Sequence, residues 1–234
     1  MNNSEIPVWV ILPAAGVGAR MGSEYPKQYL PLKDKAIIEW TLELFLAMEN
    51  VAGVIVSVRS DDQRWLQSRY SHHSRVVTVR GGQERSDSVL SAVNWVYEHQ
   101  SRNAWVMIHD VVRPCVRSED LQRLQSHCLT TLRPAILAVP VSDTIKKVDG
   151  DLIVDTVERS HLWQAQTPQM FPVEPLKQAF ERVVQGGVVV TDDASVMEFV
   201  GADIDIVRGH RDNIKVTTPE DLELVEMILE RYKC

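Results

Sequence analysis

The stretch VWVILPAAGVGARM, residues 8–21, joins an apolar run to a loop that contains two glycines. The run at 8–12 is short and rich in Val and Ile, which is typical of a strand buried on both faces of a sheet. Gly16 and Gly18 allow the backbone to approach a ligand closely, and exposed N–H groups in such a loop can bind phosphate. Glycines at this spacing also occur in ordinary turns, so the rest of the chain must decide between the two interpretations.

Similar apolar runs alternate with amphipathic stretches along most of the chain. The amphipathic stretches carry apolar residues at three- and four-residue spacing, which indicates helices. This alternation predicts an α/β fold: a single domain over residues 1–234 with a mostly parallel central sheet flanked by helices. The expected strands are 8–12, 54–58, 75–79, 105–109, 135–139 and 204–207, and the expected helices are 37–48, 64–70, 85–99, 119–128, 173–184, 193–200 and 219–232.

One segment, at about residues 141–160, departs from this alternation. Residues 143–148 and 152–157 are two strand-like runs joined by Asp149-Gly150, a dipeptide typical of tight hairpin turns. A lone two-stranded hairpin is marginally stable in water, so we expect this protruding arm to pack on something else. A second subunit, giving a homodimer, is one candidate, and the body of the same chain is the other.

Composition and charge exclude several classes of protein. The chain has 234 residues with 44% apolar and 24% charged residues, close to the globular average, which argues against disorder. A net charge of -7 argues against a nucleic-acid partner, and no apolar run approaches the ~18 residues of a membrane span. The three cysteines form no CxxC pair, and the start of the sequence lacks a signal-peptide pattern. We therefore expect a cytoplasmic protein that binds neither nucleic acid nor membrane.

Polar residues follow several of the expected strands, at the edge where ligands bind in open parallel sheets. Arg20 and Lys27 stand near the glycine loop, and the segments 81–85, 110–113 and 141–144 follow later strands. The loop lacks the third glycine of a dinucleotide fingerprint and the G-K-[ST] of a Walker loop. Basic residues around glycines suit a nucleoside triphosphate, whose charge must be neutralised before a nucleophile approaches.

Other polar segments allow two interpretations each. GGQERSDSV at 81–89 fits a strand–helix turn with a capping Ser, and it also fits a base-recognition loop. Segments 157–172, 191–199 and 212–222 fit turns and helix caps, with Thr191 or Asp192 as one such cap, or parts of a binding site. The residues alone do not decide among these.

Taken together, seven short strings resemble the 2-C-methyl-D-erythritol 4-phosphate cytidylyltransferase family of the non-mevalonate isoprenoid pathway. They occur in the family's order from residue 12 to residue 220 and are more specific as a set than any one alone. The resemblance implies a Rossmann-like nucleotidyltransferase fold with a β-arm that interlocks two subunits. The strings are LPAAGxGxRM…PKQY, GGxERxDSV, HDxxRP, DTIK, TPQxF, TDDAS and DNIKVT.

The resemblance also implies a nucleotide site, carried over position by position. Gln83 stands where the family often has an acidic residue, and Val111-Val112 stand where it has two alanines, which bears on the base and ribose contacts. The implied nucleotide-binding residues are Pro13, Ala14, Ala15, Gly16 and Gly18 along the nucleotide and Gly82, Gln83, Arg85 and Ser88 around the cytosine.

For the acceptor and the chemistry, the resemblance implies a cluster of cations and polar side chains. The implied catalytic residues are Arg20, Lys27, Arg159 and Lys215, and the implied residues around the methylerythritol phosphate are Asp110, Arg113, Thr144, Thr167 and Thr191. Thr144 and Arg159 lie on the arm, so a partner subunit could contribute them.

The implied reaction joins CTP and 2-C-methyl-D-erythritol 4-phosphate and releases pyrophosphate. A phosphate monoester has its second pKa near ~6, so the nucleophile is largely ionised at neutral pH and needs no general base. We expect Mg²⁺ as the cofactor, held mainly by the triphosphate and not by a protein metal site.

Two alternatives stay in view. A ribitol 5-phosphate cytidylyltransferase would share the fold and the chemistry. A dinucleotide-dependent oxidoreductase is disfavoured, because Asp61 and Asp62 at the end of the second strand lie far beyond the ~20-residue spacing from the glycine loop that such enzymes use.

Overall fold

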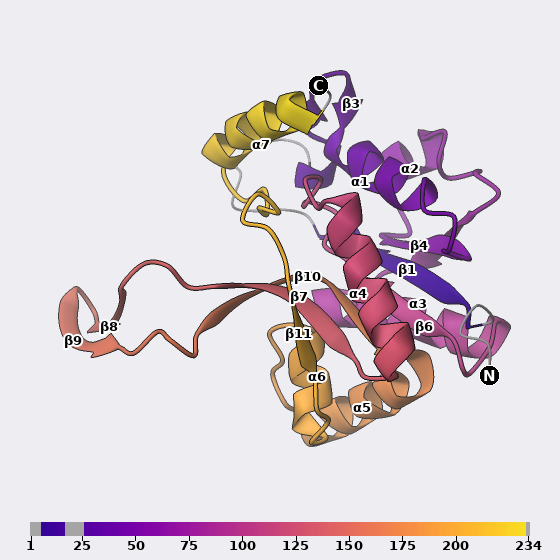
Figure 1. The fold of residues 1–234 in the computed structure, drawn as a ribbon. Helices are drawn as coiled ribbons and strands as arrows, with labels where there is room; N and C mark the ends of the chain where they lie inside the picture. The colour runs from indigo at the N-terminus through magenta and orange to yellow at the C-terminus, as the bar shows by residue number, and fades with distance from the viewer. Residues whose placement is uncertain (1–5, 17–25, 233–234) are drawn as a thin grey trace.

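The computed structural model of the chain describes residues 6–16 and 26–232. Its centre is a sheet of seven strands in which β10 alone runs antiparallel to its neighbours, so the predicted mostly parallel α/β fold is confirmed (Figure 1). Across the sheet the strands are β11 (Asp205–Arg208), β7 (Ala135–Pro140), β10 (Trp163–Pro172), β6 (Trp105–Ile108), β1 (Val8–Pro13), β4 (Gly53–Val58) and β5 (Val76–Arg80).

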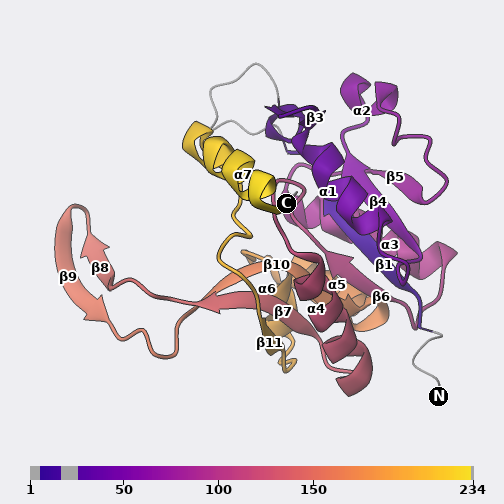
Figure 2. The ribbon, with the colours of Figure 1, turned by 45° about the horizontal axis from the view of Figure 1, so that its top comes forward.

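Helices cover both faces of this sheet (Figure 2). Successive side chains of β1 point to opposite faces, so Val10 and Leu12 enter one apolar core and Trp9 and Ile11 the other. Each large apolar side chain that is fully buried in these cores contributes about 1.5–3 kcal/mol. On the first face lie α1 (Ile37–Leu46), α2 (Gln63–Gln67), α4 (Ser118–Thr131) and α7 (Pro219–Tyr232), and on the second α3 (Arg85–His99), α5 (Val173–Gly186) and α6 (Asp193–Phe199). Among the described residues, no helix combines the length and the apolar character needed to cross a bilayer.

Strand β10 lies in segment 157–172, for which the sequence allowed two interpretations, turns or part of a binding site. It inserts between β6 and β7, and its register shifts between Ala165 and Gln169. Gln169 is 1% exposed, but its amide group is satisfied: Nε2 donates to the Asp192 carboxylate and Oε1 accepts from the Ala194 N–H. Polar residues can therefore occupy a central strand here, which is why the hydrophobic pattern did not identify it.

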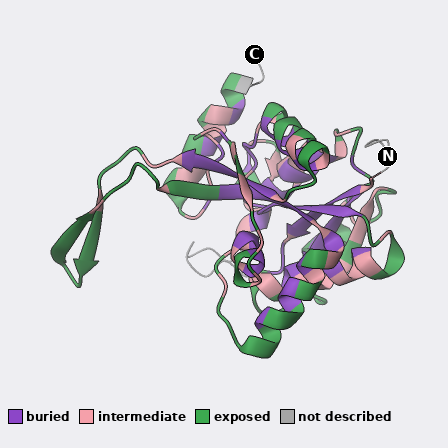
Figure 3. Ribbon diagram, turned by 60° about the horizontal axis from the view of Figure 1, so that its bottom comes forward, coloured by how far each residue is buried: buried purple, intermediate pink, exposed green. Residues whose placement is uncertain are grey.

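The predicted hairpin is confirmed as β8 (Ile145–Asp149) and β9 (Leu152–Val157), a two-stranded sheet separate from the central one. Gly150 lies in the turn at φ +54°, a conformation that favours glycine. The arm projects away from the body and is exposed along its length (Figure 3). Apolar side chains on it face solvent in the single chain: Val148, Leu152, Ile153 and Val154.

Candidate active site

The carboxyl ends of β1, β5 and β6 meet at one edge of the sheet and line a cavity of about 630 Å³, here called the cleft. The segment after β11 reaches the same edge. The expected convergence is confirmed for the described part of the glycine loop and for segments 81–85 and 110–113, whereas segment 141–144 does not line the cleft. The residues named from the sequence that line the cleft are Pro13, Ala14, Ala15, Gly16, Lys27, Gly82, Gln83, Arg85, Ser88, Asp110 and Lys215.

Asp110 is the electrostatic centre of the cleft. Its Oδ1 accepts from Arg85 Nε at 2.9 Å, and its Oδ2 lies 2.8 Å from Lys215 Nζ and 3.5 Å from Arg113 Nε. Burial acts to raise the pKa of Asp110, but the charges of Arg85 and Lys215 outweigh it and hold that pKa well below its usual range. Asp110 therefore stays ionised and fixes the side chains around it.

The walls of the cleft are held by contacts that require particular residues. Gln28, which the sequence analysis did not single out, is buried and donates from Nε2 to the carbonyls of Ala14 at 2.7 Å and Gly16 at 3.2 Å. A Cβ atom at Gly82 would lie 2.1 Å from the Cβ of Asp87, so only glycine allows this loop to pack against α3. The Ser88 hydroxyl accepts from the Gly82 N–H at 3.1 Å and so fixes the loop from the helix side.

Behind the cleft, hydrogen bonds fix the protonation of His109. Its Nε2 lies 3.0 Å from the Arg113 carbonyl, which can only accept, so Nε2 carries a proton. Its Nδ1 lies 3.0 Å from the Thr167 hydroxyl, whose oxygen also accepts from the Asp110 N–H. Burial lowers the pKa of His109 to about 4, so the ring is neutral at pH 7 and both nitrogens are occupied.

This neutral histidine makes stability depend on pH. The unfolded chain binds the His109 proton near pH ~6.5, and the folded chain only near pH 4. Below pH ~6.5 the unfolded state therefore binds more protons, and the free energy of unfolding should fall by up to about 3 kcal/mol as the pH drops toward 4. Urea unfolding at a series of pH values measures this slope. In His109→Gln, the free energy of unfolding should fall less between pH ~6.5 and 4, because this histidine no longer titrates. The same pH dependence in the variant as in the wild type would contradict a neutral, buried His109.

Several residues named from the sequence lie outside the cleft lining or outside the described residues. Gly18 and Arg20 fall outside the described residues. Thr167 is 5% exposed with its hydroxyl engaged by His109 and Asp110, and Arg113 donates from Nη1 to the Asn213 carbonyl at 2.8 Å. Both support the cleft from behind. Thr191 lines a neighbouring cavity of about 660 Å³, which shares Arg85 with the cleft.

The two residues on the arm are also separate from the cleft of their own chain. Thr144 is exposed just before β8, and Arg159 donates from Nη1 to the Ser142 carbonyl at the base of the arm. Arg211 also binds the segment where the arm begins, donating to the Ser142 hydroxyl at 2.6 Å and to the Pro140 carbonyl at 3.3 Å.

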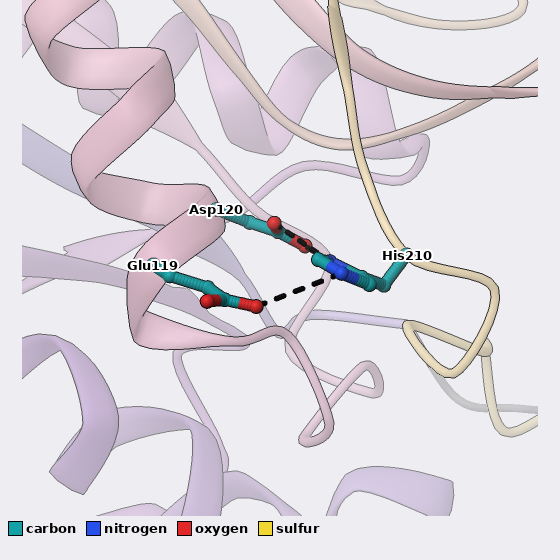
Figure 4. Close-up of side chains that lie close together, drawn as sticks. All are labelled: Glu119, Asp120 and His210. Carbon is teal, nitrogen blue, oxygen red and sulfur yellow. Dashed lines mark hydrogen bonds and ion pairs between the residues drawn. The ribbon is translucent and has the colours of Figure 1, made fainter.

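Glu119 and Asp120 of α4 lie beside His210, which follows β11 (Figure 4). His210 Nδ1 lies 2.9 Å from both carboxylate oxygens of Asp120, and its Nε2 lies 3.6 Å from Glu119. These residue types can hold a metal ion, but Arg123 and Arg117 already form ion pairs with the two carboxylates. The His210–Asp120 contact links α4 to the segment after β11.

The chain is similar to known proteins in both sequence and fold. The sequence profile of the family IspD, 2-C-methyl-D-erythritol 4-phosphate cytidylyltransferase, matches residues 8–231. The chain is 44% identical to the protein of that name from Vibrio atlanticus over 97% of each chain, and 44% identical to that from Vibrio cholerae over 100% of this chain and 99% of the other. The solved structure of the Francisella tularensis protein superposes with a TM-score of 0.84 at 33% identity, covering 95% of this chain and 99% of that one.

Proposed function

Because the chain belongs to the 2-C-methyl-D-erythritol 4-phosphate cytidylyltransferase family, we propose that the cleft is where its two substrates react. The chain is a CTP-dependent nucleotidyltransferase of isoprenoid precursor biosynthesis. It joins the cytidylyl group of CTP to 2-C-methyl-D-erythritol 4-phosphate and releases pyrophosphate. One observation carries the assignment to the cleft: Lys215 and Arg85, on segments far apart in the sequence, meet at Asp110 beside the glycine loop.

CTP lies along the backbone of the glycine loop, with its cytosine against the loop after β5. Residues 13–16 line the cleft, and Gln28, which lines it too, fixes this backbone by donating to the carbonyls of Ala14 and Gly16. Gly82, Gln83 and Ser88 line the other end of the same cavity, which supports a base pocket there. The resemblance also assigns Gly18 to the nucleotide and Arg20 to its phosphates, and both residues lie outside the described part of the chain.

The attacking group is the phosphate of the acceptor, which is already ionised at neutral pH. No general base is required, and His109, the buried histidine at this edge, has both ring nitrogens occupied. The main barrier is repulsion: two unit charges 4 Å apart cost about 4 kcal/mol at an effective dielectric of 20. Arg20, Lys27 and Lys215 offset this repulsion and the charge that grows at the α-phosphorus.

Mg²⁺ fits the cleft as an ion bound mainly by triphosphate oxygens. Asp110, the buried carboxylate of the cleft, is already surrounded by the cations Arg85, Arg113 and Lys215, so it is a poor ligand for Mg²⁺. Mg²⁺ typically binds substrate phosphates and keeps several waters, which suits such a site. When bound, it would neutralise triphosphate charge.

The arm completes the site of a second subunit in a homodimer. A two-stranded sheet with exposed Leu152 and Ile153 is only marginally stable alone, and a partner would cover it. Arg159 and Thr144 do not line the cleft of their own chain, which supports their action in the cleft of the partner. Arg suits a phosphate because its planar guanidinium binds two oxygens at once.

A cytoplasmic location agrees with the described cysteines. Cys115 and Cys128 are unpaired, and burial raises the pKa of both thiols to about 12. Unpaired thiols are usual in a reducing compartment.

Pyrophosphate release tests the substrate assignment. We expect turnover with CTP and 2-C-methyl-D-erythritol 4-phosphate, little turnover with UTP, ATP or GTP, and loss of activity in excess chelator that added Mg²⁺ restores. Equal turnover with UTP would contradict the base pocket, and full activity in chelator would contradict the need for Mg²⁺. Faster turnover with ribitol 5-phosphate would identify the alternative acceptor.

A further inference from the structure

Asp193 is a buried carboxylate beside the cleft, and the reaction as described so far assigns it no role. It is 1% exposed and lies at the first residue of α6. Its two oxygens accept from Nη1 of Arg85 at 3.0 Å and from Nη2 at 2.8 Å, a bidentate pair. Such a pair fixes the plane of the guanidinium as well as its position.

The plane of Arg85 decides where its third donor points. With both Nη groups on Asp193, Nε donates to Oδ1 of Asp110 at 2.9 Å. Oδ2 of Asp110 then pairs with Lys215 at 2.8 Å, with Arg113 Nε farther away at 3.5 Å. The side chains thus form a chain of alternating charge, from Asp193 through Arg85 and Asp110 to Lys215.

Asp193 itself is fixed by the central sheet. The Asp192 side chain caps α6 by accepting from the Ser195 N–H at 3.0 Å. Gln169 of β10 donates to the same Asp192 at 2.8 Å and accepts from the Ala194 N–H at 2.8 Å. The start of α6 is therefore attached to β10 on both sides of Asp193, so Asp193 is a rigid support.

We infer that Asp193 is a positioning residue for cytidylyl transfer: it orients Arg85 so that Asp110 keeps one carboxylate oxygen for Lys215. The inference rests on the proposed role of Lys215 at the reacting phosphates. Without the Asp193 charge, Arg85 turns its Nη groups toward Asp110 and competes with Lys215. Lys215 then loses its fixed place, and small displacements at a reacting centre can cost about 10²-fold in rate.

The test is Asp193→Asn, which keeps the size of the side chain and removes its charge. We expect kcat to fall at least about tenfold while the KM for CTP changes less than about threefold, because Asp193 acts on the reaction through Arg85 and Lys215. Glu198→Gln is the matched control: it removes the charge of an exposed carboxylate on the same helix and should leave kcat unchanged.

A double variant separates positioning from simple destabilisation. If Asp193 acts through Arg85, the kcat of Arg85→Gln/Asp193→Asn should equal that of Arg85→Gln alone, and removing both charges should restore stability lost in Asp193→Asn. Wild-type kcat in folded Asp193→Asn, or losses that add in the double variant, would overturn the inference. A wild-type chain without turnover of CTP and acceptor would instead refute the proposed function, and this inference with it.

Discussion

Replacing Lys215 by alanine is expected to lower kcat by two or more orders of magnitude, about 3 kcal/mol, with the fold intact. Lys215 places its ammonium 2.8 Å from Asp110 in the cleft, where charge grows only as the phosphates react. The fold should survive because Asp110 keeps Arg85 and Arg113 as partners. Steady-state kcat at saturating CTP and acceptor, together with the unfolding temperature, measures both effects.

Lys27→Ala should behave in the same way, since Lys27 lines the same cleft. Lys177→Ala is the control: Lys177 forms an ion pair with Glu181 on α5, away from the cleft, and its loss should leave kcat unchanged. A near-normal kcat in Lys215→Ala would remove that side chain from the mechanism.

The glycine loop and the parallel strands could be predicted because their signals are local. β1, β4, β6 and β7 are short runs made mostly of apolar residues, so their boundaries follow from composition to within about one residue. The arm was equally predictable, because Asp149-Gly150 specifies a turn between two strand-like runs. The cap at Asp192 was one of two candidates, and the structure selects it.

The residues that support the site could not be predicted in this way. Asp193 binds Arg85, 108 positions away in the sequence, and Gln28 acts on backbone carbonyls, so neither has a local pattern. Thr167 lies in β10, and the polar residues of this strand interrupt the hydrophobic pattern by which a buried strand is recognised. Within PKQY and TDDAS, Gln28 and Asp193 support other cleft residues through contacts that only the folded chain brings together.

Arg159→Ala is expected to abolish most activity although Arg159 lies outside the cleft of its own chain. Arg159 is held at the base of the arm by the Ser142 carbonyl, and the arm projects from the body with exposed apolar residues. If the arm reaches the partner's cleft, the Arg159 guanidinium binds the acceptor phosphate there. Lys146→Ala, on the exposed β8 of the same arm, is a control that should keep its activity. If the protein is a monomer at assay concentrations, the arm cannot act in a partner's cleft.

The central claim is that each site is built from the cleft of one chain and the arm of another, and mixing two inactive variants tests it most directly. Arg159→Ala and Lys27→Ala are combined under conditions that allow subunit exchange, and pyrophosphate release is followed. In each mixed dimer one site then carries both lesions and the other carries neither, so activity should rise toward about a quarter of wild type at full exchange. If Arg159 serves its own chain, every site keeps one lesion, and an unchanged absence of activity after demonstrated exchange would contradict the claim.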